Sequence, residues 1–294
     1  MKLGEAISSF VAFILDERGL SLNTVEAYQR DLFKFLEFRG DVDTVDLSLE
    51  DIDSFADYLD DQELAQNTRS RVFSSLRAFF SYLEIEGMSR QSFASDIQIP
   101  RKLIKLPDFL SEEEVKRLLD TPKLDTKKGI RDRAILEFLY ATGVRVSELT
   151  NLKLQNVLLD EKIVRVTGKG GKERIIPFNE YAEKYLLMYL YEVRPKILKR
   201  RGEDRVFLNL RGTPISRISV WKSLKEYAIK AGISKNLYPH ILRHTFATHM
   251  LKNGCDLRTL QIFLGHSSMM TTQIYTHLDK DYLREVHRKF HPRG

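Results

Sequence analysis

The sequence predicts a mainly α-helical protein with a small β-sheet, divided into two domains. Apolar residues recur at helical spacing over most of the chain, and patterns such as Ser111–Glu114 form a capping box that starts a helix. One pair of short apolar segments, 163–166 and 174–177, flanks a glycine-rich turn and predicts two strands. At 294 residues, 43% of them hydrophobic, the chain is long enough for two cores.

The first domain, residues 1–97, is predicted to be a bundle of four helices. A helical stripe runs from Ile7, and Asn23 begins a capping-box pattern ahead of the second stripe. Ser48 opens a third helix, and Asn67 is expected to cap a fourth. Each helix carries apolar residues on one face, so the four can enclose a small core.

A linker separates this bundle from a mixed α+β domain. Residues 98–107 contain two prolines and three basic residues and have no clear period, as expected of an extended segment. The second domain, 108–294, begins with the helix that starts at Ser111. A further helix ends near Gly143, which leaves Arg145 in a turn between helices, where its side chain can project into a cleft.

The charge is divided unevenly between the two parts. The first hundred residues carry 9 Lys and Arg against 19 Asp and Glu, whereas the remainder carries 38 against 22. A basic second part favours a polyanionic partner, since binding phosphates releases counterions. In the first part, Arg30 and Lys34 fall on the second predicted helix and Arg69, Arg71 and Arg77 on the fourth, which predicts that these two helices share a face toward the polyanion; ordinary charged helix surfaces are the alternative.

The sequence also argues against a membrane-spanning, secreted or disulfide-bonded protein. No apolar run approaches the roughly 20 residues of a membrane helix, and the first residues lack the regions of a signal peptide. The one cysteine, Cys255, cannot form an internal disulfide, so we expect a cytoplasmic protein in which this side chain packs in a core.

The glycine-rich turn Gly168-Lys-Gly-Gly-Lys172 does not predict a nucleotide-binding loop. Such a loop requires Ser or Thr after the Gly-Lys pair and a helix beyond it, whereas Glu173 and a second strand follow here. Two interpretations remain. The turn is either a plain hairpin or a mobile one that delivers a lysine, whose pKa falls readily near other cations.

The functional prediction depends on a set of residues suited to phosphodiester chemistry, which is Arg145, Lys169, His240, Arg243, His266 and Tyr275. Two guanidiniums bind non-bridging phosphate oxygens through charge-assisted forks and stabilise a five-coordinate transition state. A tyrosine, with its usual pKa near 10, becomes a nucleophile when cations and a base assist loss of its proton. A lysine can then protonate the leaving 5′-oxygen. No metal or other cofactor is expected, because no histidine is accompanied by a carboxylate or cysteine at zinc-site spacing.

In this order the set resembles that of the tyrosine recombinases, the phage integrase family, and in particular the Xer recombinases of bacteria and archaea. The resemblance covers nearly the whole chain and is looser in the first domain. Its motifs are Thr142-Gly-Val-Arg-Val-Ser-Glu-Leu149, Gly168-Lys-Gly170, His240-Ile-Leu-Arg-His-Thr-Phe-Ala-Thr-His249, Leu264-Gly-His266 and Thr272-Gln-Ile-Tyr-Thr-His277.

The resemblance implies a role for each residue. Arg145 and Arg243 would clamp the scissile phosphate, and Glu148 would help to position the site. His240 would assist proton transfer at the nucleophile Tyr275. His266 would donate a hydrogen bond to the phosphate, and Lys169 would be the general acid.

It further implies that the two domains close as a C-shaped clamp on duplex DNA at a dif-like site, and that four protomers form a homo- or hetero-tetramer that resolves chromosome dimers. A DNA translocase is a possible activator, and no membrane is involved. Contacts to DNA are expected from Asn23, Thr24, Arg30, Arg69, Arg71, Arg77 and Lys172.

The tail, residues 281–290, carries an apolar stripe of Leu283, Val286, His287 and Phe290. The resemblance favours docking of this helix into a neighbouring protomer over docking on its own core, because an exposed apolar stripe needs a partner. Other functions considered are an integrase or transposase of a mobile element, a type IB topoisomerase-like nicking-closing enzyme, and a DNA-binding regulator without catalysis.

Overall fold

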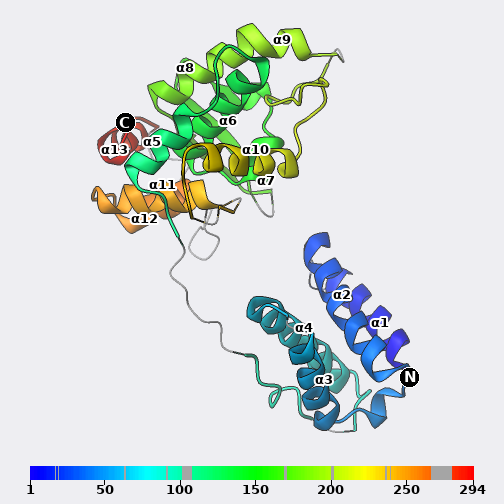
Figure 1. Cartoon of the computed structure of the whole chain (residues 1–294). Helices are drawn as coiled ribbons and strands as arrows, with labels where there is room; N and C mark the ends of the chain where they lie inside the picture. The colour runs from blue at the N-terminus through cyan, green and yellow to red at the C-terminus, as the bar shows by residue number, and fades with distance from the viewer. Residues whose placement is uncertain are drawn as a thin grey trace. The chain divides into compact units, whose positions relative to one another are not determined.

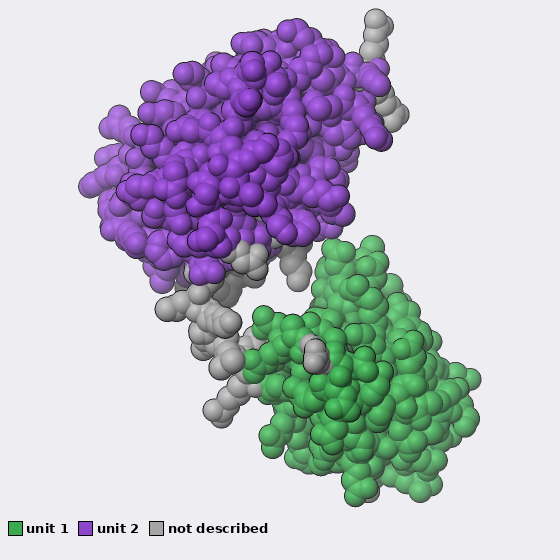
Figure 2. Space-filling view, viewed as in Figure 1, with its two compact units in different colours: residues 1–105 green, residues 106–294 purple. Residues whose placement is uncertain are grey.

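The computed structural model describes the chain except for residues 17, 19, 63, 91, 101–107, 169, 170, 200, 201, 236, 239 and 266–279. The chain divides into two compact units, unit 1 (Met1–Lys105) and unit 2 (Leu106–Gly294), each with its own hydrophobic core (Figure 1 and Figure 2). Helices predominate, and the three-stranded sheet lies in unit 2, so the predicted fold class is confirmed. The C-shaped clamp stays a prediction, and most of the predicted linker lies outside the described residues.

Unit 1 is the predicted four-helix bundle. Aromatic rings fill its centre, with Phe10 5.6 Å from Phe79 and Phe35 5.2 Å from Phe55 between ring centroids. Edge-to-face ring pairs of this kind add to the stabilisation that burial already gives. The helices are α1 (Leu3–Asp16), α2 (Leu22–Arg39), α3 (Leu49–Asp61) and α4 (Gln66–Ile85), with a short 3-10 turn, η1 (Thr44–Asp46).

Two predicted helix starts in unit 1 are wrong by two residues. The N-cap of α2 is Ser21, and Asn23 lies inside the helix. The N-cap of α4 is Ala65, so Asn67 lies within its first turn. The start at Ser48 is confirmed, and its backbone N–H donates to the carboxylate of the third helical residue at 2.9 Å. The missed starts share a cause, since a polar residue in the first helical turn looks the same in sequence as one at the cap.

Unit 2 is built around the helix α6 (Lys127–Thr142), which is buried along nearly its whole length and packs against α5, α8, α10 and α11 (Figure 1). The other helices of the unit are α5 (Glu112–Asp120), α7 (Val146–Thr150), η2 (Leu154–Asn156), α8 (Glu180–Met188), the π-helix η4 (Tyr189–Val193), α9 (Arg194–Ile197), α10 (Arg217–Lys230), α11 (Ile241–Lys252), α12 (Leu257–Leu264) and α13 (Lys280–Phe290).

The sheet is antiparallel with strand order β1-β2-β3, formed by β1 (Val157–Leu158), β2 (Ile163–Thr167) and β3 (Glu173–Pro177). The predicted hairpin is confirmed, and its register runs from Ile163 opposite Pro177 to Thr167 opposite Glu173. The short strand β1 was not predicted. Alternation along β3 places Arg174 and Ile176 on the buried face, which becomes important at the site below.

The predictions about membrane helices and about the cysteine can be compared with the described part of the chain. No helix in it has the length and apolar character needed to cross a membrane. Cys255 is buried in the core of unit 2, and this burial raises the pKa of its thiol to about 11. At neutral pH the side chain is therefore a protonated packing residue, as predicted.

Candidate active site

The end of α6 sets the position of the first predicted site residue. Gly143 ends this helix with φ +60°, a conformation that glycine adopts without strain. A Cβ atom here would also lie only 2.5 Å from Cδ1 of the buried Phe246, so two separate constraints require glycine. The chain then turns, and Arg145 becomes the N-cap of α7.

Arg145 is oriented by Glu148, one helical turn further on. The carboxylate accepts the Arg145 backbone N–H at 2.8 Å through Oε2 and Nη1 at 2.9 Å through Oε1. The Arg145 side chain remains one-third exposed, whereas that of Glu148 is 5% exposed. An arginine is therefore held by a buried acid while part of its guanidinium faces solvent.

Arg243 comes from the first turn of α11 and is anchored by backbone oxygens. Its Nη1 donates to the carbonyl of Gly143 at 2.8 Å, and Nη2 donates to the carbonyl of Leu264 in the last turn of α12. The last carbonyls of a helix have no partner within the helix, and the helix dipole favours a cation there. Arg243 thus connects the ends of two helices and is fixed by both.

The pKa values of Arg243 and His240 are both lowered by their surroundings, which favours binding of an anion. Burial first, and then the positive charges of Arg145 and Arg174, lower the pKa of Arg243 to about 9. The pKa of His240, the N-cap of α11, is lowered by partial loss of hydration and then by Arg243 and Arg145. A site that disfavours further positive charge in this way would be stabilised by a bound phosphate.

Arg174 belongs to the same cluster, and sequence reasoning missed it. Its Nη1 and Nη2 donate to Glu148 Oε1 and Oε2 at 2.9 and 2.8 Å, and its Nε donates to the carbonyl of Phe263 at 2.8 Å. The sequence holds a signal for it, because strand alternation puts Arg174 on the same face as Ile176. An arginine on the core face of a strand requires a buried acceptor.

Three of the predicted residues, Lys169, His266 and Tyr275, lie outside the described residues. The residues before the first two are described and lie beside the Arg174–Glu148 ion pair. A Cβ atom on Gly168 would be 3.5 Å from Arg174 Nη1, and one on Gly265 would be 3.1 Å from the same atom. The structure thus gathers Arg145, Glu148, His240 and Arg243 and brings two further points of the chain to the same place.

A cavity of about 320 Å³ opens beside this cluster, between α7 and the hairpin. Its lining includes Arg145, Gly168 and the exposed Arg165 of β2. One arginine from each of these two elements lines the cavity, which suits it to an anionic group.

The arginines predicted to contact DNA from unit 1 have partners inside that unit. Arg69 forms an ion pair with Asp60, and Arg77 donates to the carbonyl of Ile97. Sequence did not indicate these partners, because they lie on neighbouring segments rather than on the same helix.

Arg71 donates to Asp31, whose carboxylate is fully buried and also accepts the Ser75 hydroxyl at 2.9 Å. Arg71 is nevertheless nearly half exposed. The other predicted DNA contacts lie at the surface or close to it, and they are Asn23, Thr24, Arg30 and Lys172. Their role toward DNA stays a prediction.

The tail helix α13 packs on the core of its own unit. Leu283, Val286 and His287 are buried there, and His287 Nε2 donates to the carbonyl of Ala141 at 2.7 Å. His291, just beyond the helix, donates to the carbonyl of Tyr140 at 3.3 Å. The expectation that the apolar stripe lacks a partner in its own chain is therefore wrong.

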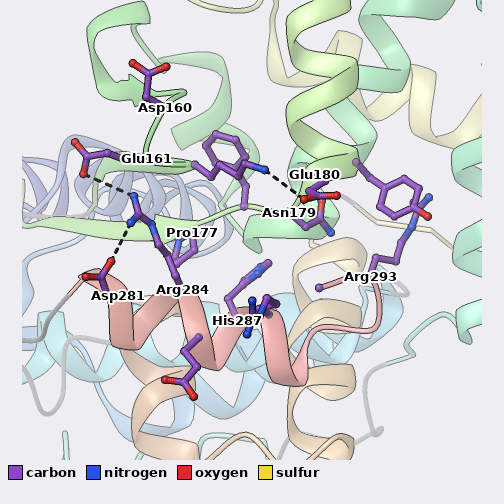
Figure 3. Close-up of a pocket in the computed structure, with 15 residues that line it drawn as sticks. Asp160, Glu161, Pro177, Asn179, Glu180, Asp281, Arg284, His287 and Arg293 are labelled. Atoms are coloured by element: carbon purple, nitrogen blue, oxygen red, sulfur yellow. Dashed lines mark hydrogen bonds and ion pairs between the residues drawn. The ribbon is translucent and has the colours of Figure 1, made fainter.

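Charged pairs hold the rest of the tail. A cavity of about 700 Å³ lies between α13 and the region of β3 and α8. Figure 3 shows Arg284 there, bridging Asp281 and Glu161. Arg293 Nη1 donates to Glu137 Oε2 at 2.8 Å, and its guanidinium lies 3.9 Å from the centre of the Tyr181 ring.

Comparison with known proteins agrees with this geometry. The model of the phage integrase family matches residues 108–281, and that of the phage integrase N-terminal SAM-like domain matches residues 7–87. Tyrosine recombinase XerD of Staphylococcus aureus strain Mu50 is 43% identical, and the alignment covers 98% of this chain and 99% of that protein.

Two solved structures extend the comparison. XerA recombinase is 33% identical with a TM-score of 0.51, over 99% of this chain and 100% of that one. The XerH site-specific recombinase, bound to its palindromic difH substrate, is 26% identical with a TM-score of 0.71, over 91% of this chain and 80% of that one. With both domains matched and this identity over its length, the chain belongs to the phage integrase family and is a site-specific tyrosine recombinase of the Xer type.

Proposed function

We propose that Arg145 and Arg243 hold the scissile phosphate of duplex DNA while Tyr275 attacks it. The supporting observation is the number of donors that remain. A guanidinium has five N–H donors. Toward the described residues, Arg243 uses two on the carbonyls of Gly143 and Leu264 and Arg145 uses one on Glu148, so three donors of Arg243 and four of Arg145 are left for other partners. Each guanidinium is thus anchored by some of its N–H groups, and the others can donate hydrogen bonds to the oxygens of a five-coordinate phosphorus.

His240 is the proposed acceptor of the Tyr275 proton. Its lowered pKa keeps the imidazole neutral near pH 7, so a ring nitrogen can accept a proton. As the tyrosine oxygen bonds to phosphorus, the bond from phosphorus to the 5′-oxygen breaks. Lys169 is the proposed donor of the proton that this oxygen takes up, and His266 the proposed donor of a hydrogen bond to the phosphate. The product is a 3′-phosphotyrosine ester. The freed 5′-hydroxyl of a second strand then attacks the phosphorus of this ester, which joins the strands and releases the tyrosine.

The proposed biological substrate is a dif-like site, recombined in the cytoplasm to resolve chromosome dimers. Support comes from the Xer relatives and from the structure of XerH solved on difH. Strand exchange requires cleavage of two duplexes, so we propose a homo- or hetero-tetramer, with a DNA translocase as an activator.

The test is covalent trapping. A duplex nicked next to the cleavage position loses a short 5′ fragment after attack, so the ester accumulates and is detected as a protein–DNA adduct on a denaturing gel. We expect an adduct with the unmodified chain. Tyr275→Phe should bind the same DNA with unchanged affinity and form none. Adduct formation by Tyr275→Phe at the unmodified rate would exclude this tyrosine as the nucleophile.

Adducts recovered from cells would identify the DNA. Sequencing should give one chromosomal site of dif type. Recovery of the ends of a mobile element would instead assign an integrase or transposase, and scattered sites would indicate a topoisomerase-like activity. Absence of any adduct would leave a DNA-binding regulator.

A further inference from the structure

Arg174 lies where three separate segments of unit 2 meet. It belongs to β3, binds Glu148 in α7 through both Nη atoms, and binds the carbonyl of Phe263 in α12 through Nε. Its side chain is 4% exposed and that of Glu148 is 5% exposed. A bidentate pair of this kind fixes the plane of both groups, and lysine cannot replace it.

The acceptors of Glu148 are fully used only when Arg174 is present. An ionised carboxylate has about four lone-pair sites. Two are taken by Arg174, and the other two by the backbone N–H and Nη1 of Arg145. Arg174 thus fixes the face that Glu148 presents to Arg145. Arg145, Glu148 and Arg174 together carry one net positive charge, which attracts a phosphate, whereas Glu148 with Arg145 alone would be neutral.

Arg174 also fills the space between two backbone segments. Gly265 ends α12 with φ +63°, and a Cβ atom there would lie 3.0 Å from Arg174 Cδ and 3.2 Å from Cζ. Gly168 closes the base of the hairpin, where its N–H donates to the Lys172 carbonyl at 2.7 Å. The arginine is therefore in contact with both the hairpin base and the helix end.

We infer that Arg174 is a positioning residue for DNA cleavage, which sets the orientation of Arg145 through Glu148 and connects the hairpin base at Gly168 with the α12 end at Gly265. It acts through these groups and does not touch the phosphate. The inference rests on the proposed function, since cleavage is the property that it affects.

The experiment compares full-length variants in single-turnover trapping on the nicked duplex from pH 5 to pH 9, with DNA affinity measured in parallel. Arg174→Gln should bind DNA within about 3-fold of the unmodified chain but form the adduct about 10–100-fold more slowly, as is usual for loss of a group that orients a catalytic residue. The pH profile should change as well. Arg174 offsets the effect of burial on Glu148 and holds the pKa of that carboxyl low, so its loss should move the acid limb of the rate to higher pH.

Two further variants separate positioning from stability. Arg174→Lys keeps the charge, so the acid limb should stay near that of the unmodified chain, but the rate should remain reduced because the fork is lost. Arg131→Gln is the matched control, since Arg131 is also buried and pairs with Asp132 at 2.6 Å, but near the start of α6. It should cost stability without moving the acid limb.

An unshifted profile for Arg174→Gln, with a rate loss no larger than that of Arg131→Gln, would overturn the inference. If Arg174→Gln does not fold, judged by circular dichroism, an unmodified rate for Arg174→Lys would do the same. Failure of the unmodified chain to form any adduct is a different result, which would remove the proposed function and this inference with it.

Discussion

Replacing Gly143 by alanine tests how the end of α6 supports the site. The change has two costs in unit 2. An L-residue at φ +60° loses about 1–2 kcal/mol of folding free energy. The new Cβ atom would lie 2.5 Å from Phe246 Cδ1 and 3.0 Å from Cγ and Cε1. Overpacking of a buried site costs about 1–3 kcal/mol, and Phe246 is fully buried, with the rings of His287 and His291 6.3 and 5.8 Å away.

Gly232 offers the matched control. It has φ +67°, and a Cβ atom there would meet nothing within 4 Å. Gly232→Ala therefore carries the conformational cost without the steric one, and the gain from a less flexible unfolded chain is common to both. The unfolding free energies of the two variants should differ by about 1–3 kcal/mol, the overpacking cost, with Gly143→Ala the less stable.

The single tryptophan of the chain provides the assay. Trp221 lies in α10, so its fluorescence in urea follows the unfolding of unit 2 without a contribution from unit 1. Gly143→Ala should also slow adduct formation, because the carbonyl that holds Arg243 belongs to the altered residue. Equal unfolding free energies for the two variants, within about 0.5 kcal/mol, would show that Phe246 yields without cost and would refute the reasoning.

Other predictions concern the tail and unit 1. Burial lowers the pKa of His287 to about 4 from 6.5, so the unfolded state binds more protons between these values, and unit 2 should lose about 3 kcal/mol of stability as the pH falls from 6.5 to 4. His287→Gln should reduce this loss in urea unfolding at each pH, while the part due to the buried His291, whose pKa burial also lowers, stays, and an unchanged slope would show that His287 does not contribute. In unit 1, Arg71→Ala leaves the buried Asp31 without its cation and should cost about 1–3 kcal/mol by calorimetry, after allowance for the exposure of Arg71. Arg30→Ala, which loses a hydrogen bond to its own helix, should cost less than about 0.5 kcal/mol, and equal losses would contradict this account of Asp31.

The elements that sequence predicted correctly depend on contacts between near neighbours in the chain. The capping box at Ser111, the helix end near Gly143 and the hairpin between β2 and β3 each depend on residues that lie close together in the sequence, and all are present. His240 and Arg243 share the start of α11 for the same reason.

The parts that sequence could not predict depend on partners that lie far away along the chain. The acceptors of Arg174 are 26 and 89 residues away, and the stripe of α13 finds its contact with Ala141 146 residues away. Periodicity shows that a stripe or a buried charge needs a partner, but it does not show which one. Partners in the fold also distinguish Arg69 and Arg77, which are held inside unit 1, from the exposed Arg30.

The carbonyls at the end of α6 accept hydrogen bonds from the tail of the chain, which affects the order in which unit 2 can fold during synthesis. Those of Tyr140 and Ala141 are satisfied by His291 and His287, which are separated from them by 151 and 146 residues. At a synthesis rate of roughly 5–20 residues per second, those donors reach the ribosome exit about 7–30 s after the helix itself. During that interval the helix end that seats Arg243 has no donors from the tail. A nascent chain thus contains the arginines of a DNA-cutting enzyme before it contains the residues that complete their support.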